Sequence, residues 1–406
     1  MNTYKISTNR CFALLLSVAF CHYTLFMYIE EVIGKLPLIS MLSVFFFPVL
    51  YFILFILSYK SSTRLRIHIS AIGIFTFFML EIMLTYVFHP DNVQYIESKF
   101  VSDILPCIPF FWLGLSLTLD DDTYNTVSLF SCIAIIISTL YLFYYMGSGR
   151  LLRGSHGEDY SMYWSYLLLP NTMIAIEYTF KRKKIFSLVC SIVGVVYAFV
   201  MGTRGAIIIL FAYIITCIWR YLNISIRKKI LSMMALSLIS VGFVVSPVYL
   251  SLLKNVRSVL ENSGVSTRIV DYLISGGIVS YTSGRDIIYL DLLGKLAEKP
   301  LLGWGVYGEY PLGYDAGAHN LYLEVVFNFG YPLGIILLIS FIILYIKALK
   351  RTKGKLVYGW IVLFGCLVFI KGIFGGSYLD YSVFFLLGMC LKEIRFSSKN
   401  TTYRTD

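Results

Sequence analysis

Residues 319–346 read HNLYLEVVFNFGYPLGIILLISFIILYI, a polar pair followed by an apolar run long enough to cross a lipid bilayer as one helix. The run is continuously apolar and lacks the alternation that a β-barrel strand would show. It follows a hydrophilic segment, residues 251–318, in a chain that is otherwise mostly apolar. The chain is therefore expected to fold as a membrane protein. We expect chemistry in the polar segment, which ends at a histidine beside a span.

The composition of the whole chain excludes a soluble globular protein. Of the 406 residues, 58% are hydrophobic and only 14% are charged, and the mean hydropathy is +0.76. Apolar runs of roughly 20 residues, the length of a membrane-spanning helix, recur along the sequence. We predict an all-α polytopic membrane protein with a single integral membrane domain over residues 1–406. Its transmembrane helices number about twelve, at 11–29, 36–57, 67–88, 100–119, 127–146, 163–180, 185–201, 206–219, 230–250, 321–346, 356–374 and 378–391.

Basic residues indicate which way the chain crosses the membrane. The formal net charge is +11, and lysines and arginines cluster in short connections between spans, for example within 60–66, 181–184 and 347–355. If the spans alternate, these connections share one face, which the positive-inside rule assigns to the cytoplasm together with both termini. A nucleic-acid partner is therefore not expected. Three aspartates at 120–122 fall on the same face, and the sequence offers no function for them.

The same alternation places residues 251–318 on the outer face as one large extracytoplasmic loop, with six basic side chains against seven acidic ones. A smaller outer loop, 147–160, carries Arg150 and Arg153. The eight cysteines lie in or at the ends of apolar spans and form no C-x-x-C pair, so the sequence implies neither a disulfide framework nor a zinc site. We expect no metal and no cofactor.

Within the large loop, the pattern predicts one amphipathic helix. Ser283 is a candidate N-cap, Asp286 stands three residues later, and apolar residues then recur at helical spacing as far as Pro300. We expect this helix to lie on the outer membrane interface, with Arg285 in its first turn.

Several polar residues at the outer boundary could carry chemistry. His319 has an imidazole, whose ordinary pKa of about 6.5 allows it to accept a proton at neutral pH. Asn320 and Glu324 follow it closely. Arg204, between two glycines, and Arg285 carry guanidinium groups, whose fork of donors fits phosphate oxygens. Taken singly, each is more commonly an interfacial residue without a catalytic role.

Three blocks stand in order in the second half of the chain. The first is Gly-Thr-Arg-Gly-Ala at 202–206. The second is Ser-Gly-Arg at 283–285, followed by Lys-Pro-Leu-Leu-Gly-Trp-Gly at 299–305. The third is His-Asn-Leu-Tyr-Leu-Glu at 319–324, followed by Gly-Tyr-Pro-Leu-Gly at 330–334. In order, spacing and outer location these blocks resemble the O-antigen polymerase and O-antigen ligase superfamily of bacterial envelope glycosyltransferases.

The resemblance implies a fold like that of the membrane-embedded C-type glycosyltransferases. It implies glycans linked to undecaprenyl diphosphate as donor and acceptor, joined at the periplasmic face of the bacterial inner membrane. The reaction would be a metal-independent, inverting transfer. His319 would be the general base, and Arg204 and Arg285 would stabilise the leaving diphosphate.

The resemblance also assigns substrate-binding roles. Asn320 and Glu324 belong to the motif that contains the histidine. The outer loop at 147–160 departs from the family pattern, since it has no motif that aligns. Polymerases of the superfamily often hold the growing chain with a basic outer loop, so Arg150 and Arg153 are expected to contact the substrate as well. Membrane lipid and a chain-length regulator protein are further candidate partners.

Other functions remain open on the sequence alone. We favour a polymerase that joins repeat units into O-antigen or a related surface polysaccharide, whereas an O-antigen ligase would transfer the glycan to the lipid A core. A multi-span transporter or a glycolipid flippase is an alternative of another class, although no pair of similar halves is visible in the sequence. A scaffold within an envelope assembly complex is a third option.

Overall fold

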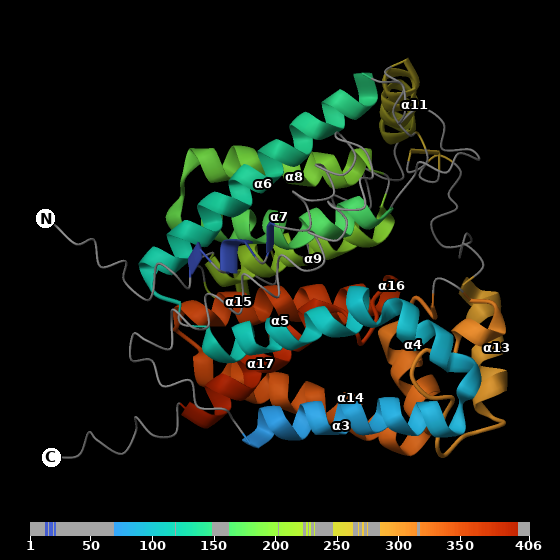
Figure 1. The fold of residues 1–406 in the computed structure, drawn as a ribbon. Helices are drawn as coiled ribbons and strands as arrows, with labels where there is room; N and C mark the ends of the chain where they lie inside the picture. The colour runs from blue at the N-terminus through green and yellow to red at the C-terminus, as the bar shows by residue number, and fades with distance from the viewer. Residues whose placement is uncertain are drawn as a thin grey trace, which may run out of the picture. The chain divides into compact units, whose positions relative to one another are not determined.

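The computed structural model describes residues 69–117, 119–147, 162–201, 203–221, 247–262, 285–314 and 317–396, with short stretches at 13–14, 16–18, 20–21, 225, 227–228, 231, 267, 270–271 and 274. Every element in this part of the chain is helical (Figure 1). The longer helices are α3 (Ile69–Phe88), α4 (Val93–Lys99), α5 (Leu105–Ser116), α6 (Asp121–Gly147), α7 (Met162–Arg182), α8 (Ile185–Val200), α9 (Arg204–Tyr221), α11 (Pro247–Asn262), α13 (Arg285–Leu296), α14 (Leu321–Thr352), α15 (Leu356–Gly365) and α17 (Tyr381–Phe396). Short helical segments are η1 (Pro90–Asn92), η2 (Phe100–Ile104), η3 (Tyr310–Leu312), η4 (Cys366–Ile370) and α16 (Lys371–Phe374).

Predicted spans and observed helices agree closely where both can be compared. The spans predicted at 67–88, 163–180 and 185–201 are observed as α3, α7 and α8. Three helices in the described part are long and apolar enough to cross a membrane: Asp121–Phe143, Leu321–Thr352 and Leu356–Phe374. A fourth is added if α3 and the segment Pro90–Lys99, which meet at 114°, form one broken span. The count of twelve stays a prediction, since the spans at 11–29, 36–57 and 230–250 lie largely outside the described residues.

The chain divides into two compact units, which are described separately. The first holds α3 to α5 and α13 to α17, and the second holds α7 to α9 and α11, while α6 begins in the first and continues in the second. The predicted outer loop, 251–318, contributes most of α11 to the second unit and α13 to the first.

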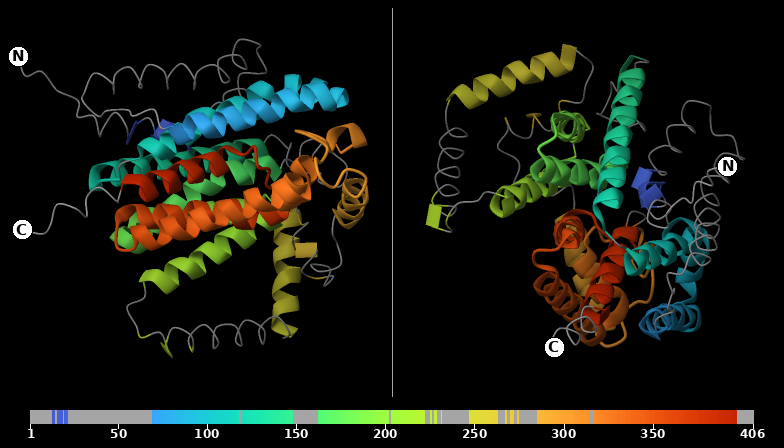
Figure 2. Two further views of the ribbon diagram at one scale, coloured as in Figure 1. Left: turned by 90° about the horizontal axis from the view of Figure 1, so that it is seen from below. Right: turned by 90° about the vertical axis from the view of Figure 1, so that its left-hand side faces the viewer.

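Two helices of the first unit, α5 and α17, lie side by side (Figure 2), and glycines bring their backbones into close contact. A Cβ atom on Gly114 would stand 2.2 Å from the carbonyl oxygen of Phe385, and one on Gly388 would stand 2.3 Å from that of Phe111. Small residues between two helices let the backbones approach, which is the usual device of helix packing in membranes. Helices α14 and α15 also pack against α17.

Helix α14 is broken at Gly330, which has φ 76° and ψ 168°. Pro332 has no N–H, so the carbonyl of Asn328 loses its normal partner four residues on. The loop that follows α13 replaces the missing bonds: Trp304 N–H donates to Phe327 O at 2.9 Å, and Gly305 N–H donates to Asn328 O at 3.0 Å. In return Tyr331 N–H donates to the carbonyl oxygen of Pro300 at 2.8 Å. Backbone groups that would be costly to bury unpaired are thus satisfied across the break.

The same loop is held from its other side by the bend between α3 and α4. The side chain of Asn92 donates to the carbonyl oxygens of Trp304 and Val306, at 2.8 and 3.1 Å, and Val306 N–H donates to the hydroxyl of Thr85 at 3.0 Å. We call residues 300–306 the bridging loop, because their backbone connects this bend to the break in α14.

Gly330 is expected to tolerate no side chain. A Cβ atom there would stand 2.4 Å from the carbonyl oxygen of Leu301, and its φ lies in the left-handed region. We predict that Gly330→Ala lowers the free energy of unfolding by about 2–4 kcal/mol, measured as a lowered Tm in detergent micelles. Gly294→Ala is the matched control: it sits inside α13 with nothing within 4 Å of the added Cβ, so it should stabilise by about 0.5–1 kcal/mol. Equal Tm values for the two variants would contradict the prediction.

The second unit is held by a buried carboxylate at the ends of α7 and α9. Glu177 is 2% exposed and accepts both guanidinium nitrogens of Arg220, at 3.0 and 3.1 Å. The hydroxyls of Tyr213 and Tyr221 donate to the same carboxylate at 2.6 and 2.7 Å. A buried charge is stable only when it is paired and hydrogen-bonded to this degree.

We predict that Glu177→Gln destabilises the protein by about 3 kcal/mol, because it leaves a mostly buried arginine without its counter-charge. Thermal unfolding in detergent measures the effect. Asp271→Asn is the control in the same unit, since it removes a carboxylate paired with Arg257 at 2.7 Å but half-exposed to solvent, and should cost less than about 1 kcal/mol. A loss of stability no larger for Glu177→Gln than for Asp271→Asn would show that the buried pair adds little.

The three aspartates at 120–122, unexplained by the sequence, begin α6. Asp120 accepts the N–H of Thr123 at 2.8 Å through its side chain, as an N-cap residue does. Asp121 and Asp122 occupy the first turn, where negative charge is favoured by the helix dipole. Their role in the described structure is therefore to start the helix.

Candidate active site

The entry to α14 presents His319 in an uncommon backbone conformation. Its φ of 51° lies in the left-handed region, where a residue other than glycine is infrequent and often marks a functional site. The next residue, Asn320, is the N-cap: its side-chain oxygen accepts the N–H groups of Tyr322 and Leu323, at 3.0 and 3.1 Å. The cap fixes where the helix begins, so the imidazole is held at the helix entrance.

Helix α13 lies beside this entrance because it buries one apolar face there. Leu292 and Leu296 are fully buried in a cluster with Ala318 and Phe327. One turn earlier, the hydroxyl of Tyr289 donates to the carbonyl oxygen of His319 at 3.4 Å. The predicted amphipathic helix is therefore present, and it supports the loop that carries the histidine.

Arg285 is the first residue of α13 and is anchored at its guanidinium. Its Nη1 donates to the carbonyl oxygen of Phe374 at 2.6 Å. Phe374 ends α16, at the start of the turn that leads to α17. We call residues 374–380 the site turn, since it contacts the site at more than one point.

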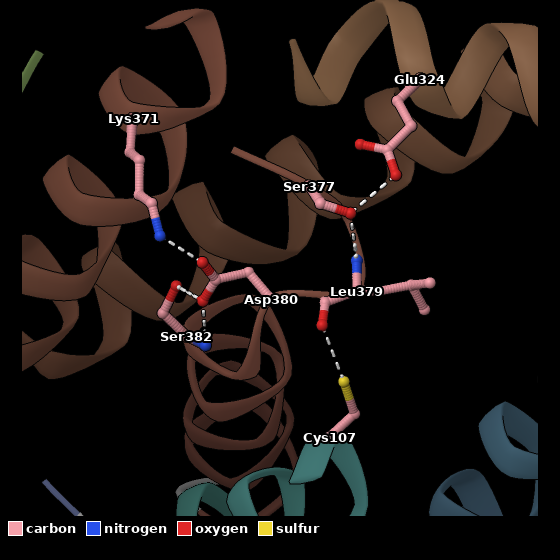
Figure 3. Close-up of polar contacts among 7 residues, drawn as sticks. All are labelled: Cys107, Glu324, Lys371, Ser377, Leu379, Asp380 and Ser382. Atoms are coloured by element: carbon pink, nitrogen blue, oxygen red, sulfur yellow. Dashed lines mark hydrogen bonds and ion pairs between the residues drawn. The ribbon is translucent and has the colours of Figure 1, made fainter. Parts of the chain in front are cut away.

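Glu324 is bound to the same turn. Its side chain is buried, and Oε1 accepts the hydroxyl of Ser377 at 2.6 Å, while that hydroxyl accepts the N–H of Leu379 at 3.1 Å. Figure 3 shows the carboxylate of Glu324 pointing from α14 toward Ser377. Arg285 and Glu324 are thus both attached to the site turn, although they are far apart in sequence.

A buried ion pair stabilises the site turn from its other end. The ammonium group of Lys371 binds Asp380 Oδ2, and Asp380 Oδ1 accepts the N–H and hydroxyl of Ser382 at 2.9 and 2.7 Å (Figure 3). Both members of the pair are only 15% exposed. The pair closes the turn between α16 and α17 and so fixes the position of Ser377.

The surroundings of His319 keep its imidazole neutral. Burial lowers the pKa of His319 below its ordinary value, and the positive charge of Arg285 lowers it further. Within the part of the chain that the structure describes, no residue hydrogen-bonds the ring. A neutral imidazole with an available nitrogen can accept a proton at pH 7.

Glu309 is a buried carboxylate that the sequence patterns do not reveal. With the amide of Asn328 oriented to suit its neighbours, Asn328 donates to Glu309 Oε2 and to the carbonyl oxygen of Gly305, both at 3.0 Å. Oε1 has no hydrogen-bond partner among the described residues, and burial raises the pKa of Glu309 to about 7. The only sequence signal is its position as a lone charge in an aromatic and glycine-rich stretch. It lies near Gly317, where an added Cβ would stand 3.5 Å from Oε1.

The structure brings together four of the residues predicted from the sequence: Arg285, His319, Asn320 and Glu324 belong to the first unit and meet around the start of α14. Ser377, Asp380 and Glu309 are additions that the sequence did not indicate.

The other predicted site residues are not tested by this geometry. Arg204 is the first residue of α9 and belongs to the second unit, so its share in the site stays a prediction. Arg150 and Arg153 lie outside the described residues.

A comparison with family models finds a match in the segment that contains the site. Residues 186–338 match the model of the O-antigen ligase family. All three sequence blocks, from 202–206 to 330–334, fall inside this matched segment, which confirms the resemblance to the polymerase and ligase superfamily. Compared with curated proteins and with solved structures, the chain matches none of them.

The matched segment ends within α14, so it includes His319 and Glu324 but not the site turn. Residues of α16 and of the site turn complete the surroundings of the site from outside this segment. In the described residues, no group of three or more histidine, cysteine, aspartate or glutamate side chains is placed to hold a metal ion.

The effect of Arg285 on His319 can be measured directly. We predict that Arg285→Gln raises the pKa of His319, because a positive charge no longer opposes protonation, while burial still keeps that pKa below about 6.5. Arg285→Lys retains the charge and should leave the pKa near the wild-type value. An NMR titration of the histidine ring in detergent micelles reports both. An unchanged pKa in Arg285→Gln would show that the guanidinium does not act on the imidazole.

Proposed function

We propose that the protein is a membrane glycosyltransferase that joins undecaprenyl-diphosphate-linked oligosaccharide repeat units into O-antigen or a related surface polysaccharide, at the outer face of the bacterial inner membrane. The observation that carries the proposal is the meeting of Arg285, His319 and Glu324 at the entrance of α14, inside the segment that matches the O-antigen ligase family. A scaffold protein has no need for a neutral histidine held beside an arginine.

The proposed chemistry is a single displacement. The acceptor hydroxyl gives its proton to the imidazole of His319 as its oxygen bonds to the anomeric carbon of the donor sugar. The bond from that carbon to the diphosphate oxygen breaks, and the configuration at the carbon is inverted. General-base assistance of this kind typically contributes about 10²- to 10⁴-fold in rate.

The leaving diphosphate carries the negative charge that develops in the reaction. The guanidinium of Arg285 would stabilise it, since charge-assisted donors fixed before the reaction act where that charge appears. Phe374 O and the site turn fix this guanidinium. Arg204 is proposed as a second cation, and Asn320 and Glu324 as groups that position the sugar or the arginine. No step of this scheme uses a metal ion.

The nature of the acceptor separates two enzymes of the same chemistry. A polymerase transfers the donor glycan to another lipid-linked repeat unit, whereas a ligase transfers it to the lipid A core. The description of the matched family favours the ligase, and the His-Asn-x-x-Leu-Glu block favours the polymerase. The purified protein, given a defined undecaprenyl-diphosphate repeat unit with or without lipid A core, distinguishes them by a ladder of polymer lengths or by a modified core.

We predict that His319→Ala lowers kcat by about 10²- to 10⁴-fold, and that Arg285→Gln lowers it by about 10²- to 10³-fold. The measurement is product formation by the purified full chain. In wild-type protein, kcat/KM should fall as the pH decreases through the lowered pKa of His319, because protonation removes the base.

His89→Ala is the matched control, because His89 lies at the bend after α3, where its ring contacts Lys299 and not the groups around His319. It should keep activity within about twofold of wild type. If His319→Ala retained full glycan transfer, or if the protein moved an intact glycolipid across the membrane without joining sugars, the enzyme proposal would be lost.

A further inference from the structure

Glu309 is a buried carboxyl group that the proposed reaction does not use. The residue is 1% exposed. Its Oε2 accepts an amide N–H of Asn328 at 3.0 Å, whereas Oε1 has no hydrogen-bond partner among the described residues. An unpaired buried oxygen is costly, and the cost is far larger for an ionised carboxylate than for a neutral acid. Such an atom is uncommon in a folded protein and points to a role other than packing.

The unpaired oxygen faces the loop that carries His319. A Cβ atom built on Gly317 would stand 3.5 Å from Oε1 of Glu309, an ordinary van der Waals distance. Gly317 precedes the histidine by two residues, and both have a φ in the left-handed region, at 74° and 51°. The main chain just before His319 therefore lies against the carboxyl group of Glu309, in a conformation that the surrounding contacts must maintain.

Asn328 connects Glu309 to the two segments that contact α14. Its amide also donates to the carbonyl oxygen of Gly305, in the bridging loop, at 3.0 Å. In that orientation the amide oxygen faces the hydroxyl of Tyr378, in the site turn, at 3.4 Å. A change in the charge of Glu309 therefore acts where the loop of His319 meets α14, the bridging loop and the site turn.

Two charged groups near Glu309 act on its ionisation in opposite directions. Glu324 lies one turn before Asn328 on α14 and is also buried, so the two carboxylates would repel each other. Lys99, at the end of α4, favours the ionised form. Lys99 is partly exposed, however, and its ammonium group lies over the ring of Tyr310, 4.6 Å from the centroid.

The other titratable groups that the structure places around this carboxyl group add no positive charge. The hydroxyls of Tyr310 and Tyr378 are neutral at pH 7, and Asp103, in η2, accepts the hydroxyl of Tyr307 at 3.1 Å. Burial is the main cause that raises the pKa of Glu309 to about 7. The carboxyl group therefore changes its charge near neutral pH.

We infer that Glu309 is a positioning residue for His319: as a neutral acid it packs against the loop before the histidine, and as a carboxylate it displaces that loop. For its effect on turnover the inference rests on the proposed function, since it takes His319 as the base. When the acid ionises, its proton passes to water, and the charge on Oε1 must be solvated. The described residues offer Oε1 no donor, so the main chain at Gly317 moves to admit water, and His319 moves with it.

The first test follows the ring of His319 by NMR in detergent micelles and needs no substrate. The resonance is assigned by its loss in His319→Ala. Besides the titration of the imidazole itself, we expect a second inflection at about pH 7, because displacement of the loop changes the surroundings of the ring. Glu309→Gln should remove that inflection, since an amide stays neutral and matches the shape of the acid. Glu298→Gln, which changes an exposed carboxylate paired with Lys295, should retain it.

The second test is the pH dependence of kcat for glycan transfer by the purified full chain. In wild-type protein, kcat should rise as His319 loses its proton and fall again above about pH 7. The fall should reach about 10²-fold, the loss typical of a reacting group displaced by about 1 Å. Glu309→Gln should keep the rising limb and lose the falling one, so that it is faster than wild type in alkaline buffer. A role in stability alone predicts a lower Tm for this variant and an unchanged profile.

The outcomes separate the two proposals. If no sugar is transferred but the second inflection is present in wild type and absent in Glu309→Gln, the proposed function fails and the positioning role stands. If sugar is transferred but the ring titrates in a single step, or if both profiles fall alike above pH 7, Glu309 does not act on His319. That result overturns the inference and leaves the proposed function standing.

Discussion

The arrangement of the first unit depends on one exchange of backbone hydrogen bonds at the break in α14. Gly330 and Pro332 prevent the helix from pairing its own carbonyls, and the bridging loop supplies the N–H groups of Trp304 and Gly305 in their place. In a membrane, groups left unpaired would cost several kcal/mol each, so the two segments depend on each other. The exchange fixes the end of α13 against α14, and therefore Arg285 near His319.

The site turn is the second element on which the site depends. It receives the guanidinium of Arg285 at Phe374 and the carboxylate of Glu324 at Ser377, and the pair of Lys371 and Asp380 closes it. These contacts attach the guanidinium of Arg285 and the carboxyl group of Glu324 to one short turn and give each a hydrogen-bond partner. A base that stays neutral can take a proton from an acceptor hydroxyl, and a fixed cation beside it can stabilise an anionic leaving group. The two together suit a transfer reaction of the proposed kind.

Local signals in the sequence predicted the elements better than their connections. The change from polar to apolar residues at Leu321 located the start of α14, and helical periodicity after Ser283 located α13. The break at Gly330 was not predicted, because the sequence around it reads as one continuous apolar span. Ser377 and Glu309 were missed for another reason. Their partners, Glu324 and Asn328, lie far away along the sequence. A single hydroxyl or carboxylate that belongs to no spacing pattern gives no local signal of a site. The pairing of His319 with Arg285 came from the family resemblance rather than from periodicity.

The bridging loop is secured through its main chain, with glycine needed where the two backbones touch at Gly303 and Gly330. Its exposed side chains, Leu301 and Leu302, are 70% and 82% accessible and contribute nothing to the exchange. Replacing either leucine should therefore leave the register between the loop and α14 unchanged. The entrance to α14 is thus specified here by the geometry of two backbones in contact, and a change in the chemistry of the exposed side chains does not reach it.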